Sequence, residues 1–257
     1  MPDSPQCQRQ SRENRPYNLR VSTVSSSSFQ GFTQTGLSFL QQVVRENSKD
    51  WFESHRGVYQ AHLLLPFRAL VEDLAPAMLA IDDRLETRPA VGKTLSRMYR
   101  DTRFSHDKSL FRNRMWLTFK RPSKEWTDAP VFFFEIAPDF FRYGLGYYSA
   151  SKATMDRFRH LMLRQPEEFA RAAACARAPF ELAGESYKRP LIKGQDAGLA
   201  TWYNRKSFAV MATDNQVESL FTPALATRLR RDLARLQPLY DLLMRVEILK
   251  QIPLDDL

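Results

Sequence analysis

The sequence has few cysteines and histidines. Its 257 residues include two cysteines and four histidines, which are Cys7, Cys175, His55, His62, His106 and His160. Two distant cysteines, one in a polar segment and one in an alanine-rich segment, form neither a disulfide framework nor a thiolate metal site. His55 and His62 are seven residues apart, too far to share a metal without further ligands. We therefore expect a reducing compartment and neither zinc nor haem, and the sequence identifies no other cofactor.

Long apolar segments are also absent. No run approaches the roughly 18 apolar residues that a membrane-spanning helix requires. The N-terminus lacks the basic start and apolar centre of a secretory signal peptide. These absences predict a cytoplasmic protein without a membrane partner, and they leave its protein partners unknown.

Aromatic residues are plentiful, with 18 Phe, 9 Tyr and 4 Trp in a chain that is 43% hydrophobic. This material is enough for one large core, in which aromatic burial supplies much of the stabilisation. Residues 1–28 are polar and end in four serines, so we expect a disordered tail there. We expect a single domain over residues 29–257.

Basic residues exceed acidic ones. The net charge is +9, and it is still +7 without residues 1–28, which hold four Arg, one Asp and one Glu. The excess therefore belongs to the predicted domain. A basic surface attracts phosphate-bearing and other anionic partners.

The first part of the domain has helical spacing. From Thr33 or Thr35, either of which can cap a helix, apolar residues recur every three to four positions as far as Asn47. A second helix is predicted to begin at residues 48–50. Pro66 fits the first turn of a third helix.

The spacing changes to period two after Pro89, which predicts strands. Met115, Leu117 and Phe119 alternate with polar, basic and aromatic residues, giving one apolar face and one basic, aromatic face. The latter face is open for binding, or it is covered by a terminal helix.

The clearest hairpin runs over residues 131–148, with a turn at residues 138–139. Its predicted register places Glu135 opposite Arg142 and Phe133 opposite Gly144. The same register sends six apolar side chains to the other face of the sheet. These are Phe132, Phe134, Ile136, Phe141, Tyr143 and Leu145.

Helical spacing returns at residues 151–164 and 166–178, and a loop follows around residues 188–194. Residues 207–212 form a candidate strand. A helix opens at Thr222, and Pro238 breaks or kinks it before a last segment that ends at Leu249. The sequence as a whole predicts an α+β fold: a helical N-terminal part, an antiparallel sheet with hairpins, and C-terminal helices packed on the sheet.

Residues 100–113 form a connection between two predicted strands in which charged side chains crowd together. Guanidinium groups bind carboxylates and phosphates through paired donors, so this connection predicts a site for a small phosphorylated or carboxylated ligand. The residues predicted to bind it are Arg100, Arg103, Lys108, Arg112, Arg114 and Trp116.

Other interpretations of the same residues remain open. Asp101 and Asp107 could pair with Arg103 and Lys108 in a purely structural ion-pair network. Trp116 could stack on a base or sugar.

Catalysis is a further alternative. His106 is a candidate general base with Ser105 or Ser109 as a nearby hydroxyl. Asp101 and Asp107 are candidate catalytic carboxylates, and with Glu135 they could share Mg²⁺ with a bound phosphate. No metal-ligand motif supports a resident metal.

The run Arg100–Ser109 resembles the signature RDxRFSxDKSPYK of a bacterial family, domain of unknown function 2461. The resemblance extends from about Phe29 to the C-terminus, and it implies a single folded unit without implying a reaction. Where the signature has Ser-Pro-Tyr-Lys, this chain has Ser109-Leu110-Phe111-Arg112, so a role for the tyrosine hydroxyl is not expected here. Further matching segments are residues 46–47, 50–52, 144–148, 157–159, 188–190 and 206–208.

These observations favour a protein that binds a small anion. A nucleic-acid-associated module is the first alternative, and it requires an extended basic surface with aromatic platforms. The second is a protein-interaction module that uses the leucine-rich segment 222–249. Whether the protein is an enzyme is left undecided by the sequence.

Overall fold

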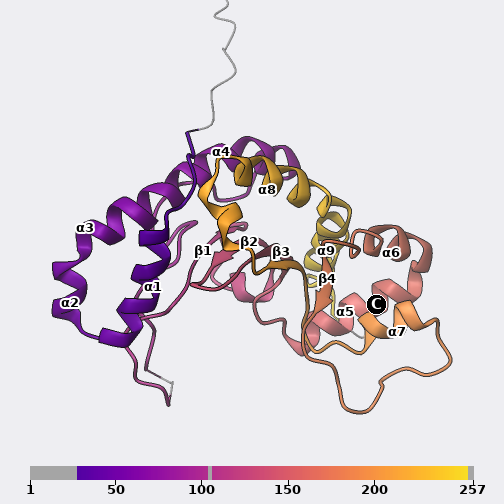
Figure 1. Cartoon of the computed structure of the whole chain (residues 1–257). Coiled ribbons are helices and arrows are strands. Elements are labelled where there is room, and N and C mark those ends of the chain that lie inside the picture. Colours follow the sequence, from indigo (N-terminus) through magenta and orange to yellow (C-terminus); the bar gives the residue numbers. More distant parts are fainter. Residues whose placement is uncertain (1–27, 104–105, 254–257) are drawn as a thin grey trace, which may run out of the picture.

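The computed structural model describes residues 28–103 and 106–253. The predicted disordered tail, residues 1–28, lies outside the described residues except for Ser28. Helices come first, then a sheet interspersed with helices, then two long helices (Figure 1). The helices are α1 (Gln34–Glu46), α2 (Lys49–Ser54), α3 (Arg56–Tyr59), the π-helix η1 (Gln60–Leu64), α4 (Leu65–Ile81), the 3₁₀ helix η2 (Trp126–Asp128), α5 (Lys152–Arg164), α6 (Pro166–Ala173), α7 (Ala197–Tyr203), the 3₁₀ helix η3 (Val217–Phe221), α8 (Ala224–Ala234) and α9 (Gln237–Leu249). The strands are β1 (Met115–Phe119), β2 (Pro130–Ile136), β3 (Phe141–Tyr147), β4 (Glu181–Ala183) and β5 (Ala209–Asp214).

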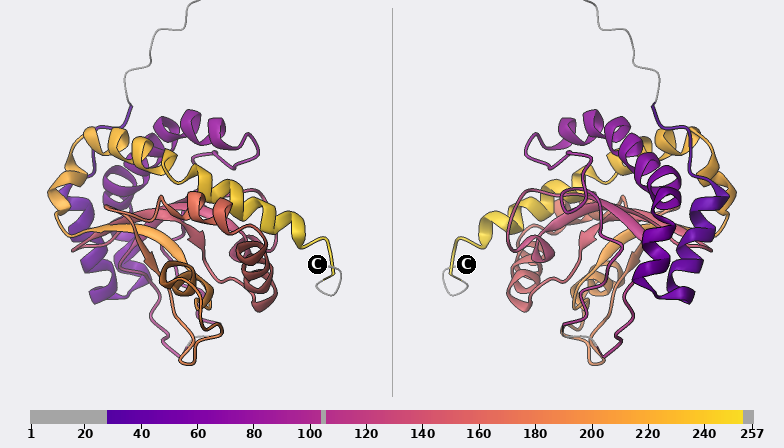
Figure 2. Two further views of the ribbon diagram at one scale, coloured as in Figure 1. Left: turned by 90° about the vertical axis from the view of Figure 1, so that its right-hand side faces the viewer. Right: turned by 90° about the vertical axis from the view of Figure 1, so that its left-hand side faces the viewer.

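The five strands form one antiparallel sheet in the order β1-β2-β3-β5-β4. Helices α4, α8 and α9 pack against β1, β3 and β2 respectively, and they cover one face of the sheet (Figure 2). Helices α5 and α6 pack on α9. This arrangement confirms the predicted α+β class.

The predicted β2–β3 hairpin is confirmed in its register. Glu135 lies opposite Arg142, and Phe133 lies opposite Gly144. The six apolar side chains predicted for the other face are fully buried and belong to one contiguous core cluster that spans Phe29 to Val246. Pairing that keeps all six away from water fixes which residues face the opposite side.

The predicted helix starts and stops in the N-terminal part are largely confirmed. Thr33 and Ser48 cap α1 and α2 by accepting backbone N–H bonds, and Asn47 ends α1 with a positive φ of 44°. Pro66 lies in the first turn of α4, as predicted, but no break precedes it, because helical structure runs on from Arg56 to Ile81 through α3, η1 and α4. Proline cannot donate to the carbonyl four residues earlier. The π-helix η1 widens the turn at that point, with the Leu65 N–H donating to the carbonyl of Gln60.

Several other predicted elements are wrong in extent or type. The strand expected before the charged connection is absent from the described residues, where only isolated bridges join Leu95 to Leu117 and Tyr99 to Phe111. Helix α6 ends at Ala173, earlier than predicted, and β5 runs to Asp214. Two elements beside the predicted loop at residues 188–194 were not predicted. They are the short strand β4 before the loop and the helix α7 after it. Both missed elements are too short to show a clear hydrophobic period.

A buried polar cluster ties α4, the end of β1 and α9 together. Asp82 is 8% exposed, and its Oδ2 accepts from Arg121 Nε at 2.6 Å and from the Tyr240 hydroxyl. Burial alone would raise the pKa of Asp82, but the hydrogen bonds from Arg121 and Tyr240 outweigh it and hold the pKa below its usual value.

We predict that Asp82→Asn destabilises the protein at neutral pH by about 1–3 kcal/mol, the cost of disrupting a buried charged hydrogen-bond group. The folded-state pKa is lowered, so the stabilisation is fully present above the unfolded pKa of about 3.9 and is lost as the pH falls through the folded value. Urea unfolding at pH 7 and pH 3 should therefore show a difference between wild type and variant that shrinks in acid. Asp83→Asn, an exposed neighbour, serves as the control; an equal effect of both variants would contradict the prediction.

Candidate functional site

The face of the sheet opposite α4, α8 and α9 presents three rows of side chains, because alternate residues of each strand point to it. The first row is charged and aromatic: Trp116, Glu135 and Arg142 lie side by side across β1, β2 and β3. The next two rows are small or apolar. They consist of Thr118, Phe133, Gly144 and Met211, and then of Val131, Gly146, Ala209 and Ala183.

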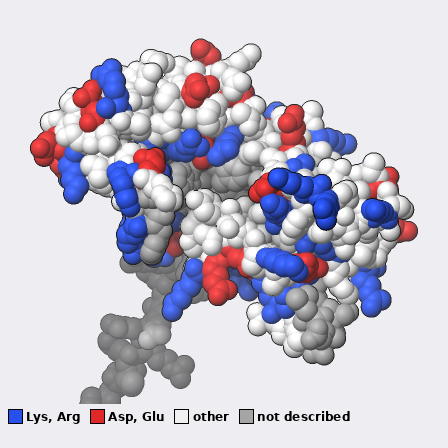
Figure 3. Space-filling model, turned by 90° about the horizontal axis from the view of Figure 1, so that it is seen from below, with Lys and Arg blue, Asp and Glu red and all other residues white. Residues whose placement is uncertain are grey.

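A cavity of about 870 Å³ lies on this face, and we call it the sheet-face pocket. Its floor is made by the three rows. Its walls come from the charged connection on one side and from the segment around Gly184 and Glu185 on the other. Seen from below, this face is hollowed, and Lys and Arg side chains gather around the hollow with Asp and Glu between them (Figure 3).

Two glycines make the floor of the pocket bare backbone. A Cβ atom at Gly144 would lie 2.1 Å from the Val210 carbonyl oxygen, and one at Gly146 would lie 2.4 Å from the Ala209 Cα. Strands β3 and β5 can therefore lie this close together because neither Gly144 nor Gly146 carries a side chain.

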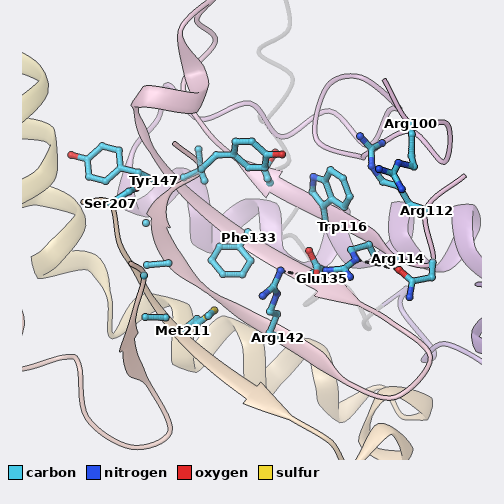
Figure 4. A pocket seen from close by; sticks show the side chains of 18 of the residues that line it. Arg100, Arg112, Arg114, Trp116, Phe133, Glu135, Arg142, Tyr147, Ser207 and Met211 are labelled. Atoms are coloured by element: carbon cyan, nitrogen blue, oxygen red, sulfur yellow. Dashed lines mark hydrogen bonds and ion pairs between the residues drawn. The ribbon is translucent and has the colours of Figure 1, made fainter. Parts of the chain in front are cut away.

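Glu135 holds two arginines in the first row. Its side chain is 10% exposed, and its Oε1 lies 3.0 Å from Arg142 Nη2 and 3.4 Å from Arg114 Nη1 (Figure 4). The buried Nε of Arg142 has no hydrogen-bond partner among the described residues. One carboxylate thus faces two guanidinium groups, and a positive charge remains at this end of the pocket.

Arg112 forms the wall next to Trp116. Its Nη1 donates to the carbonyls of Arg97 and Tyr99 at 3.1 and 2.8 Å, and its guanidinium lies 5.0 Å from the centre of the Trp116 ring. Burial lowers its pKa, and the nearby charge of Arg100 lowers it further. Arg112 remains charged because an arginine pKa starts far above neutrality. No described carboxylate forms an ion pair with it.

The other cations of the charged connection are paired internally. Arg100 binds the carboxylate of Asp107, and it donates to Ser109 Oγ at 2.8 Å. Arg103 binds Asp101 at 2.7 Å, and Lys108 donates to the Thr102 carbonyl at 2.9 Å. The predicted Asp101–Arg103 pair is therefore present. The alternative pairing of Asp107 with Lys108 is wrong, because Asp107 pairs with Arg100.

The pocket gathers only part of the predicted site. Arg100, Arg112, Arg114 and Trp116 line it together with Asp101 and Asp107. Arg103, His106 and Lys108 are not among the described residues that line it, and His106 is exposed. Ser105, the hydroxyl suggested beside His106, lies outside the described residues.

The carboxylates suggested for catalysis or magnesium binding are engaged by hydrogen bonds. Bonds from the Arg103 side chain and backbone lower the pKa of Asp101 to about 2. Bonds from Ser109 and then Arg100 lower the pKa of Asp107. Both groups are therefore ionised at neutral pH. Asp101, Asp107 and Glu135 do not form a metal-binding group: among the described residues, no cluster of three or more His, Cys, Asp or Glu side chains could hold a metal ion.

Phe133, Arg142, Gly146 and Met211 are pocket residues that were not predicted as part of the site. The hairpin register already placed Arg142 opposite Glu135. The missing information was the pairing of β1 with β2, which brings Trp116 beside Glu135. That pairing joins the charged connection to the hairpin in one surface.

The comparison with family models gives one match, over residues 35–242, to the family described as "Conserved hypothetical protein (DUF2461)". The chain belongs to this family. The part that matches DUF2461 contains the complete sheet and the charged connection, and so it contains the whole lining of the sheet-face pocket. The comparison with curated proteins gives no match.

None of the described helices combines the length and the apolar character that a membrane-spanning helix requires.

We predict that Gly144→Ala destabilises the protein by about 1–3 kcal/mol, because the added methyl group forces β3 and β5 apart. Gly57→Ala is the matched control, since a Cβ there meets nothing within 4 Å and Gly57 lies in a helix. Alanine at that position should leave stability unchanged or raise it by about 0.5–1 kcal/mol. Urea unfolding measures both effects; equal stabilities of the two variants would show that the close approach of the strands is unimportant.

Proposed function

We propose that the sheet-face pocket binds a small organic anion, in which a carboxylate or phosphate group is attached to a flat or apolar body. The proposed anion-binding site lies on the open face of the sheet beside the charged connection, and not within that connection alone. In this proposal Arg112, Arg114 and Arg142 bind the acidic group, with Arg100 at the rim.

The observation that carries the proposal is the uncompensated positive charge in the pocket. Three of the lining carboxylates each have a basic partner: Asp101 has Arg103, Asp107 has Arg100, and Glu185 has Lys206. Glu135 is shared by two arginines, and among the described residues Arg112 contacts backbone carbonyls and the Trp116 ring but pairs with no carboxylate. An acidic ligand would supply the missing negative charge, with guanidinium donors suited to its oxygens.

The remaining rows support an apolar body for the ligand. Phe133 and Met211 flank the bare floor at Gly144, which leaves room for a ring or a short chain against the sheet. The volume of about 870 Å³ lies within the range of small-molecule sites, which is roughly 300–1,000 Å³. A charged end and an apolar end together favour an amphipathic acid over an inorganic ion.

The two alternatives have less support. A nucleic-acid site requires an extended basic surface, whereas acidic side chains alternate with basic ones around the hollow (Figure 3). The leucine stripe of segment 222–249 is buried in the core, so it offers little surface to a partner. The cytoplasmic location stays a prediction, which cell fractionation would test.

We predict that anions raise the melting temperature of the protein, since a ligand that binds only the folded state stabilises it. The screen uses sulfate, inorganic phosphate, sugar phosphates, nucleotides, aromatic carboxylates and a short oligonucleotide. At least one organic acid should raise the melting temperature by several degrees. Arg112→Gln and Arg142→Gln should each abolish that shift.

Arg103→Gln is the matched control, because Arg103 lies in the same connection but does not line the pocket. It should keep the full shift. The proposal is overturned if no anion shifts the wild type, or if Arg103→Gln loses the shift while Arg112→Gln and Arg142→Gln keep it. A shift by the oligonucleotide alone would favour the nucleic-acid alternative.

A further inference from the structure

We infer that the anion bound in the sheet-face pocket carries a hydrogen-bond donor beside its acidic group, as an α-amino acid or an α-hydroxy acid does. Glu135 accepts from this donor and so determines the specificity of the site. The inference rests on the proposed function, and it names the class of ligand.

The two arginines leave part of the Glu135 carboxylate unused. Arg114 and Arg142 both make their closest approach to Oε1. No hydrogen bond from the described residues reaches Oε2, and this oxygen is not among the buried polar atoms that lack a partner. It therefore keeps access to the pocket that Glu135 lines. A carboxylate oxygen in this position is a ready acceptor for an N–H or O–H group.

The charge of Glu135 opposes a simple anion. An acidic group held by Arg114 or Arg142 lies next to the carboxylate that these arginines already share, and like charges at such short range repel each other. A donor on the ligand, placed between its own acidic group and Oε2, turns this repulsion into a hydrogen bond. Sites built to accept from a ligand donor discriminate strongly against analogues that lack it.

The rows of the floor set where the rest of the ligand lies. The row of Glu135 and the row of Phe133 are two residues apart along β2, which corresponds to about 7 Å. A ring joined to the acidic carbon by one CH₂ group spans this distance. The ligand therefore places its acid and donor in the first row and its side chain over Phe133 and Gly144.

Calorimetric titration with matched probes tests the inference. One set is L-phenylalanine, L-phenyllactate and 3-phenylpropanoate, and the other is L-alanine, L-lactate and propanoate. The wild type should bind the amino or hydroxy acid of a set at least tenfold more tightly than the acid that lacks the donor. In Glu135→Gln this preference should fall below threefold, because the repulsion of the simple acid is removed and the strongest acceptor is lost.

Glu185→Gln is the control, because Glu185 is a second carboxylate of the same pocket that pairs with Lys206. It should keep the preference of the wild type. Thermal unfolding of each variant without ligand checks that it is folded, and Glu135→Asp, which retains the charge and an acceptor, provides a second variant if Glu135→Gln does not fold. Glu135→Asp should still bind the amino or hydroxy acid of each set more tightly than the acid that lacks the donor.

The outcomes separate this inference from the proposed function. If the simple acids bind as tightly as the donor-bearing ones, or if only phosphate and sulfate bind, the inference is overturned while anion binding stands. Loss of the preference in Glu185→Gln as well as in Glu135→Gln also overturns it. If no anion of either screen binds, the proposed function fails and the inference fails with it.

Discussion

The antiparallel pairing of β1, β2, β3, β5 and β4 is the constraint on which the rest of the structure depends. Each strand residue points either to the helices or to the opposite face, and burial of the apolar residues against the helices determines which residues point which way. The six core residues of the hairpin are fully buried beneath α8 and α9, so Phe133, Glu135 and Arg142 must face the other way. The Asp82 cluster fastens α4 and α9 over the sheet from the covered side. The side chains that line the floor of the pocket are thus those that burial of the other face of the sheet leaves uncovered.

Electrostatics give this open face its character. In the floor, Glu135 lies close to both Arg114 and Arg142. The charged connection contributes Arg112, which packs against the Trp116 ring. Within the same connection Asp101 pairs with Arg103 and Asp107 with Arg100, and hydrogen bonds lower the pKa of both carboxylates. The crowded charges of the family signature therefore divide into two roles. Arg103 and Asp101 pair with each other on the surface of the connection, whereas Arg112 faces the pocket without an ion pair to any described carboxylate.

Much of the fold could be predicted from the sequence, because the local patterns of apolar and capping residues are consistent with the residues that the core buries. Alternating residues in β2 and β3 define the hairpin and its register, and Thr33, Asn47 and Ser48 mark helix ends through capping bonds. The site could be predicted only in part. Arg100 to Trp116 are close together in the chain, but Arg142 and Met211 join them through pairing between strands, which short-range patterns do not encode. The ion pairs of Arg103 and Arg100 depend on the loop conformation, so charge density alone overestimated the number of available cations.

The proposed function depends on the arginines that line the sheet-face pocket, Arg112 and Arg142 above all, and not on the exposed Arg103. The most direct measurement follows the Nε–Hε signals of the arginines by two-dimensional NMR while an acid that raises the melting temperature is added. We expect saturable shifts of the signals of Arg112 and Arg142, which line the pocket, and an unchanged signal of Arg103, which does not. Shifts confined to Arg103, with Arg112 and Arg142 unmoved at saturation, would contradict it.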